Sequence, residues 1–97
     1  MIEKIYYLAG IKDKETGEVK IYSGGTRSDP KFCILGNGLG KAYLTKKSAQ
    51  NRIKDLNVDL HRIRSESYFK KIDFVIYKVE TKITESEVYT NGEIYFN

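Results

Sequence analysis

The sequence predicts an α+β fold: a mostly antiparallel sheet of four or five strands, with one main helix (about residues 45–56) packed on one face. Strand-like apolar and aromatic segments, bounded by turn residues, recur in the N-terminal and C-terminal parts of the chain. One stretch without helix breakers in the middle has apolar residues at helical spacing. With 97 residues, 40% of them apolar, the chain is expected to form a single domain over 1–97.

The first predicted elements are three strands. Residues 2–11 are rich in apolar and aromatic side chains, and residues 18–23 alternate between apolar and polar ones. Residues 13–17 lie between them and supply Asp, Thr and Gly, which favour turns, so the two strands are expected to form a hairpin. Residues 32–35 are apolar and lie between two glycine-containing loops, which predicts a short buried strand.

The predicted helix begins at Thr45, a favourable N-cap residue. Ala49, Ile53 and Leu56 follow at i, i+4 and i+7, which places them on one face of a helix. This face is expected to pack on the sheet. Residues 57–71 fit two interpretations, an irregular continuation of the helix or a basic loop.

The C-terminal part predicts a central strand and a hairpin. Residues 72–80 are strongly β-branched and aromatic, which favours a buried strand. Residues 87–90 and 93–96 flank Asn91-Gly92, a favoured two-residue hairpin turn. The sheet face opposite the helix is expected to meet solvent or a partner, as is common in antiparallel sheets.

Charge is unevenly distributed along the chain, whose net charge is +4. Residues 1–40 carry +1, residues 41–71 carry +6 and residues 72–97 carry −3. Such a basic block marks either an interaction surface or a solvated helix face. If it is an interaction surface, the candidate binding residues are Tyr22, Arg27, Lys41, Tyr43, Lys46, Lys47, Arg52 and Lys54.

Composition excludes several kinds of protein and site. No apolar run approaches the roughly 18–20 residues of a membrane span, and the first residues lack a signal-peptide core. A cytoplasmic protein with no membrane partner is therefore expected. One cysteine, Cys33, cannot form an internal disulfide, and together with one histidine, His61, it leaves no ordinary zinc site. Neither a metal nor a cofactor is expected.

Two glycine-containing segments offer backbone N–H groups to an anion. Residues 36–41 read Gly-Asn-Gly-Leu-Gly-Lys, but their spacing is not that of a P-loop, and Ala42 stands where a Ser or Thr would hold magnesium. A flexible connection is the competing interpretation. Together with Gly24-Gly25, these residues keep a small anionic nucleotide among the candidate ligands.

Two tyrosine-containing segments resemble the paired-strand core of GIY-YIG endonucleases. They are residues 5–6 (Ile-Tyr) and 21–25 (Ile-Tyr-Ser-Gly-Gly). The resemblance implies metal-dependent phosphodiester hydrolysis, although Glu3-Lys4 replaces the glycine that opens the family motif. The alternative is a hairpin whose tyrosines pack on the sheet. The matching residues would be Tyr6, Tyr22 and Arg27, with Glu66 or Glu80 as a metal ligand.

A wider pattern over residues 5–80 resembles small uncharacterised reading frames of phages and prophages. The pattern runs Tyr-Tyr, an acidic-Gly turn, Tyr-Ser-Gly-Gly, Pro-Lys-Phe, a glycine loop, Lys-Ala-Tyr, a Thr-Lys-Lys-Ser-Ala helix and an apolar strand. Many such proteins act by binding, and they block, sponge or redirect a host component. The resemblance implies a protein that is not an enzyme and that inhibits or sequesters a host factor, for example in anti-defence.

The alternative function is a sheet-based nucleic-acid-binding domain. A sheet with one helix resembles, in architecture, domains that lay a three-stranded sheet into the major groove and read bases with basic and aromatic side chains. A GIY-YIG-like nuclease remnant is the third function. The expected partner is a host protein first, and nucleic acid or a small anionic nucleotide next. Open sheet edges would also allow a homodimer.

Overall fold

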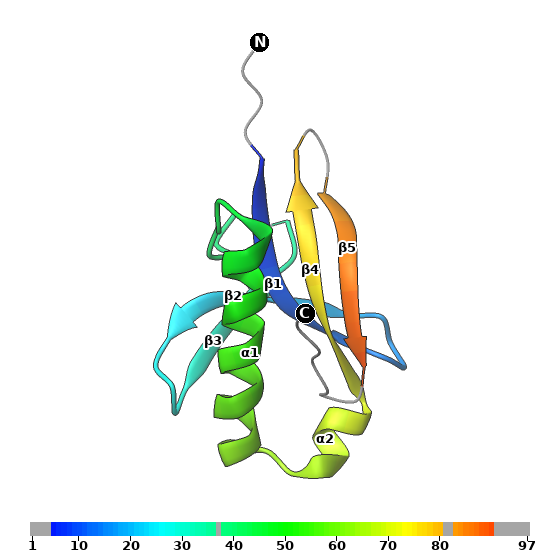
Figure 1. The fold of residues 1–97 in the computed structure, drawn as a ribbon. Helices are drawn as coiled ribbons and strands as arrows, with labels where there is room; N and C mark the ends of the chain where they lie inside the picture. The colour runs from blue at the N-terminus through cyan, green and yellow to red at the C-terminus, as the bar shows by residue number, and fades with distance from the viewer. Residues whose placement is uncertain (1–4, 37, 81–82, 91–97) are drawn as a thin grey trace.

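Five strands form one antiparallel sheet with one main helix, which confirms the predicted α+β class (Figure 1). The computed structural model describes residues 5–36, 38–80 and 83–90. The elements in chain order are β1 (Tyr6–Asp13), β2 (Val19–Gly25), β3 (Pro30–Ile34), α1 (Lys46–Ile63), α2 (Glu66–Lys70), β4 (Ile72–Val79) and β5 (Ile83–Thr90).

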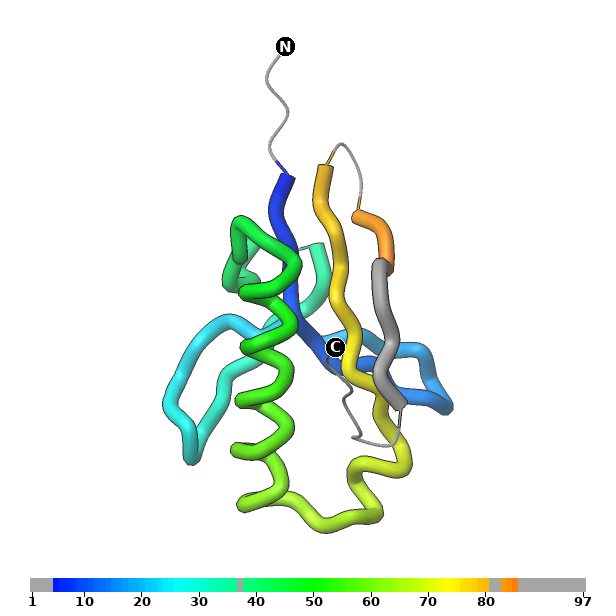
Figure 2. Tube along the Cα trace, viewed as in Figure 1, coloured from blue at the N-terminus to red at the C-terminus, as the bar shows by residue number. Residues whose placement is uncertain are grey.

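Strand β1 is the centre of the sheet, whose strand order is β3-β2-β1-β4-β5. It pairs with β4 over its whole length, from Tyr6 opposite Val79 to Asp13 opposite Ile72. Helix α1 follows β3 and leads, through α2, to β4. Strand β4 lies on the opposite side of β1 from β2 and β3. The sheet is strongly twisted, so that β4 and β5 stand upright while the β2–β3 hairpin projects sideways beside α1 (Figures 1 and 2).

Helix α1 begins as predicted and ends later than predicted. The Thr45 hydroxyl accepts a hydrogen bond from the backbone N–H of Ser48 at 3.1 Å, which satisfies one of the free donors of the first turn. The helix runs past residue 56 to Ile63, so continuation of the helix, one of the two interpretations of residues 57–71, holds as far as Ile63. Leu60 extends the buried face by one more turn, and α2 then takes up part of the ambiguous stretch 57–71.

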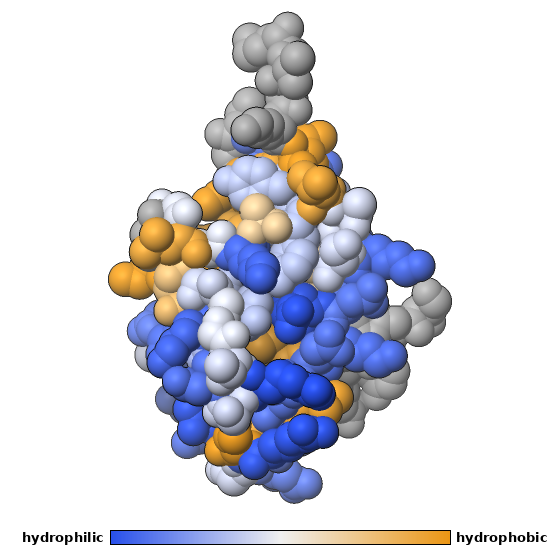
Figure 3. Space-filling model, turned by 90° about the vertical axis from the view of Figure 1, so that its left-hand side faces the viewer, coloured by the Kyte–Doolittle hydropathy of each residue, from blue (hydrophilic) through white to orange (hydrophobic). Residues whose placement is uncertain are grey.

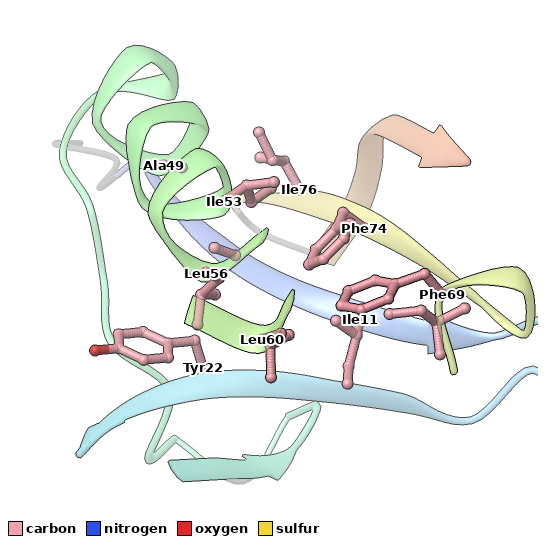
Figure 4. Close-up of a cluster of buried hydrophobic side chains, with 11 residues drawn as sticks. Ile11, Tyr22, Ala49, Ile53, Leu56, Leu60, Phe69, Phe74 and Ile76 are labelled. Carbon is pink, nitrogen blue, oxygen red and sulfur yellow. The ribbon is translucent and has the colours of Figure 1, made fainter. Parts of the chain in front are cut away.

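The main core lies between α1 and the sheet. Its α1 residues sit above side chains from β1 and β4, and α2 closes one end with Phe69 (Figure 4). Tyr22 lies at the opposite end, with its hydroxyl pointing away from the other labelled side chains (Figure 4). The buried members are Ala9, Ile11, Tyr22, Ala49, Ile53, Leu56, Leu60, Phe69, Ile72, Phe74 and Ile76.

The opposite face of the sheet also carries an apolar cluster. Leu8, Ile21, Val75 and Tyr77 are buried there, because successive side chains of a strand point to opposite faces. Gly40 lies against this cluster, and a Cβ at that position would be 2.6 Å from Cγ2 of Ile21. The expectation that this face meets solvent or a partner is therefore wrong for its central residues.

Strand β5 differs from the predicted C-terminal hairpin. Residues 87–90, expected to pair with 93–96, belong to β5, which pairs with β4 from Ile83 opposite Val79 to Thr90 opposite Asp73. The predicted turn at 91–92 and its second strand at 93–96 lie outside the described residues. The sheet therefore has five strands without them.

Candidate functional site

Three cations from three separate segments meet at a cleft between the β2–β3 hairpin and α1. The cleft has a volume of about 450 Å³. Hydrophilic side chains gather over the lower half of the face on which the hairpin and α1 lie side by side (Figure 3). We call this feature the hairpin–helix cleft. Its lining residues are Tyr22, Gly25, Thr26, Arg27, Pro30, Lys41, Arg52, Leu56 and Asp59.

The tight turn of the hairpin places Arg27 at the cleft. Thr26 and Asp29 close the turn with two backbone hydrogen bonds, 3.1 and 3.2 Å long. Gly25 precedes the turn with a φ of 94°, a conformation that favours glycine. A Cβ there would lie 2.5 Å from the carbonyl oxygen of Asp29, so the tight turn requires glycine at this position.

Arg27 is held against α1 by Asp59. The Nε atom of Arg27 lies 3.4 Å from Oδ1 of Asp59. The Asp59 side chain is 5% exposed whereas that of Arg27 is 76% exposed, so a buried carboxylate anchors a solvent-exposed guanidinium. A buried carboxylate without a partner would be strongly destabilising, and this pair therefore links the hairpin turn to the helix.

Arg52 lies over the aromatic residues at the other side of the cleft. Its guanidinium carbon is 5.1 Å from the ring centroid of Tyr22, within range of a cation–π interaction. The buried atoms Nε of Arg52 and Oη of Tyr43 have no hydrogen-bond partner among the described residues. Burial raises the pKa of the Tyr43 hydroxyl, and the nearby positive charge of Arg52 opposes that shift.

Lys41 is positioned by its backbone. Its N–H donates to the carbonyl of Tyr22 at 2.9 Å, and two residues later Tyr43 exchanges two backbone hydrogen bonds with Tyr7 of β1. These contacts attach the loop before α1 to the sheet. Within the described ranges, neither Lys41 nor Arg52 has an ion-pair partner. Three cations against one carboxylate give the lining a formal charge of +2, and the carboxylate of Asp55, which does not line the cleft, also lies near Arg52.

The structure brings together five of the eight residues predicted to bind and separates the other three. Tyr22, Arg27, Lys41 and Arg52 line the cleft, and Tyr43 lies beside Arg52. At about 100° per residue, Lys47 and Lys54 share one side of α1, about 140° and about 160° around the axis from Arg52. Lys46 lies about 120° from Arg52. The predicted binding residues therefore occupy more than one surface.

Sequence reasoning missed two charged residues of this region, Asp59 and Arg62. Arg62 lines a second hollow of about 400 Å³ on the other side of the hairpin turn, with Thr26, Arg27, Ser28 and Ile63. Both lie beyond residue 56, where the helix was expected to end. A prediction that extended the helix beyond residue 56 would have placed Asp59 two turns after Arg52, on the same side of the helix.

The residues of the GIY-YIG resemblance do not converge on one site. Tyr6 packs with the cluster on one face of the sheet, whereas Tyr22 belongs to the core on the other. Glu66 begins α2, and Glu80 follows β4, where it pairs with Lys78 at 2.7 Å. In the described ranges, no group of three or more His, Cys, Asp or Glu could hold a metal ion.

The two glycine-containing segments also lie apart. Gly25 lines the hairpin–helix cleft, whereas Gly36, Gly38 and Gly40 line a small hollow of about 120 Å³ on the opposite sheet face. This small hollow is also lined by Tyr6, Leu8, Ile21 and Cys33, among other residues. Lys41, the last residue of the longer segment, therefore lines the cleft, whereas the three glycines before it do not.

Comparison of the chain with known protein families, curated proteins and solved structures finds no match. Neither helix in the described part of the chain has the length and apolarity that crossing a membrane requires.

Proposed function

We propose that this chain is a binding protein of the phage or mobile-element type that inhibits or sequesters a host factor without turning it over. The hairpin–helix cleft is its binding site, and an anionic group of the host factor occupies it. The observation that carries the proposal is the convergence of Arg27, Lys41 and Arg52 on one concavity that contains a single carboxylate. An anion would compensate the two positive charges in excess.

The rigidity of the cleft supports binding as its role. Arg27 is anchored by Asp59, Lys41 is attached to β2 through its backbone, and Arg52 lies over Tyr22. The two guanidinium groups, which are held in place before the ligand arrives, lose less conformational freedom on binding than the exposed side chain of Lys41 does. Anti-defence by sequestration is the concrete form of this function that the resemblance to phage proteins favours.

The cleft also determines how nucleic acid, the alternative partner, would be bound. Tyr22 is only 7% exposed and lies beneath Arg52, and the opposite sheet face buries its own cluster. Reading of bases by an exposed sheet would need these aromatic side chains at the surface. Contacts with nucleic acid would therefore go through phosphates in the cleft.

A capture experiment with matched charge variants tests the proposal. The immobilised protein is exposed to bacterial host lysate, and proteins, nucleic acids and small molecules released by denaturation are analysed separately. The cleft variant is Lys41→Gln/Arg52→Gln. The control, called the outer-face variant, is Lys47→Gln/Lys54→Gln, on the side of α1 away from the cleft. Each variant removes two positive charges from exposed or half-buried positions. Circular dichroism spectra of both variants serve as the control for folding.

We expect one component to be retained at a stoichiometric amount by the wild type and by the outer-face variant, and to be lost from the cleft variant. Loss of two charge-assisted contacts corresponds to at least about a tenfold weaker affinity. Equal retention by the cleft variant, or no stoichiometric component on the wild type, would contradict the proposal.

A further inference from the structure

We infer that the ligand of the hairpin–helix cleft is a small phosphate monoester, of the size of a sugar phosphate or a nucleoside monophosphate. This inference rests on the proposed function and specifies the chemistry of the factor that is sequestered. Size, charge and the arrangement of the cations each support it.

The volume of the cleft fits a small molecule. Pockets for small ligands typically measure about 300–1,000 Å³, and the hairpin–helix cleft measures about 450 Å³. The second hollow, about 400 Å³, lies beside it across Arg27 and offers the hydroxyl groups of Thr26 and Ser28. A phosphate in the cleft would leave room there for the sugar of the same ligand.

The charge of the lining fits a dianion. Arg27, Lys41 and Arg52 exceed the single carboxylate of Asp59 by two charges. A phosphate monoester carries about −1.5 to −2 charges at neutral pH, whereas a carboxylate carries one. Guanidinium groups also match the geometry of phosphate oxygens, and the side chains of Arg27 and Arg52 both line the cleft.

The arrangement of the cations disfavours a macromolecule. A single nucleic-acid strand is bound by a track of cations with aromatic platforms for its bases. Here Lys47 and Lys54 lie on another side of α1, and Tyr22 is 7% exposed beneath Arg52. A protein partner would need an interface of about 1,000 Å² or more with an apolar centre. The residues around the cleft are mainly polar, charged or glycine.

Calorimetric titration with defined probes tests the inference. The probes are adenosine monophosphate, ribose 5-phosphate, adenosine, inorganic phosphate and a short thymidine oligonucleotide. The protein variants are Arg52→Gln in the cleft and Lys54→Gln on the outer face of α1. Each substitution removes one positive charge from α1. A difference between the two variants therefore reports a local contact in the cleft and not the change in net charge.

We expect at least one of the two phosphate monoesters to bind with one-to-one stoichiometry, and adenosine to show no binding. Arg52→Gln should weaken this binding by about 10- to 100-fold, the loss expected for a hydrogen bond to a charged group. Lys54→Gln should leave it within about twofold, because an exposed distant charge contributes little. Comparison of the two monoesters shows whether the base contributes.

The inference is overturned if neither monoester binds at millimolar concentration, if adenosine binds as well as its phosphate, or if Arg52→Gln and Lys54→Gln have equal effects. Binding of inorganic phosphate alone, or of the oligonucleotide alone, overturns it too. If the wild type, but not the cleft variant, then retains a macromolecule in the capture experiment, the proposed binding function still holds. Failure of both experiments would remove the binding function as well.

Discussion

Asp13 illustrates how one side chain holds the first turn of the fold. Its Oδ1 accepts hydrogen bonds from the backbone N–H groups of Glu15 at 2.8 Å and Thr16 at 3.0 Å. The bonds from Thr16 and Glu15 favour the ionised carboxylate and lower its pKa below the ordinary value of 3.8. The sequence predicted this turn because its signal is local, an Asp followed within four residues by Thr and Gly.

The lowered pKa predicts a pH dependence of stability. A carboxyl group with a lower pKa in the folded state stabilises the fold above its unfolded pKa, and this contribution is lost as pH falls through the folded value. We therefore expect the melting temperature of the wild type to exceed that of Asp13→Asn near pH 6, and the difference to shrink as the pH falls below the ordinary value of 3.8. A difference that stays constant as the carboxyl group becomes protonated would contradict this prediction.

Tyr22 shows where residue-level prediction reaches its limit. The sequence identified it as a candidate binding residue, and it does line the cleft. Its side chain is 7% exposed beneath α1, while its neighbour Ile21 is buried on the opposite face. Alternation along a strand separates the two faces, but it cannot show which one a helix covers when both are apolar.

Helix α1 shows why beginnings are easier to predict than ends. Thr45 is a strong start signal that needs only its own sequence context. The end carries no glycine or proline, and the C-cap is Arg64 in an extended conformation. Leu60 of α1 is buried in the core against the sheet, and this tertiary contact favours continuation of the helix through residues with modest helix propensity.

The same helix predicts a large difference between two aliphatic substitutions. Ile53 is fully buried between α1 and the sheet, whereas Val58 is 47% exposed. Ile53→Ala should lower the free energy of unfolding by about 2–5 kcal/mol, and Val58→Ala by no more than about 0.5 kcal/mol. Urea denaturation of the three proteins measures both values. A loss below about 1 kcal/mol for Ile53→Ala would show that α1 does not pack as described.

At the scale of the whole molecule, the topology assembles the candidate site. Arg27 lies in the β2–β3 turn, Lys41 in the loop before α1 and Arg52 within α1. They meet because the twisted sheet carries the hairpin sideways and α1 crosses beside it on its way to β4 (Figure 1). The sequence revealed the basic block over 41–71, but its division between the cleft and the outer face of α1 depends on this crossing.

The central claim is that the hairpin–helix cleft is a ligand-binding site. Amide and arginine side-chain NMR spectra, recorded during titration with adenosine monophosphate, test it most directly. We expect chemical-shift changes to concentrate at the amides of residues 25–29 and 41 and at Nε of Arg27 and Arg52, with Lys47 and Lys54 almost unaffected. Saturable changes that concentrate on the opposite sheet face, around Leu8 and Ile21, or no changes at all, would contradict it.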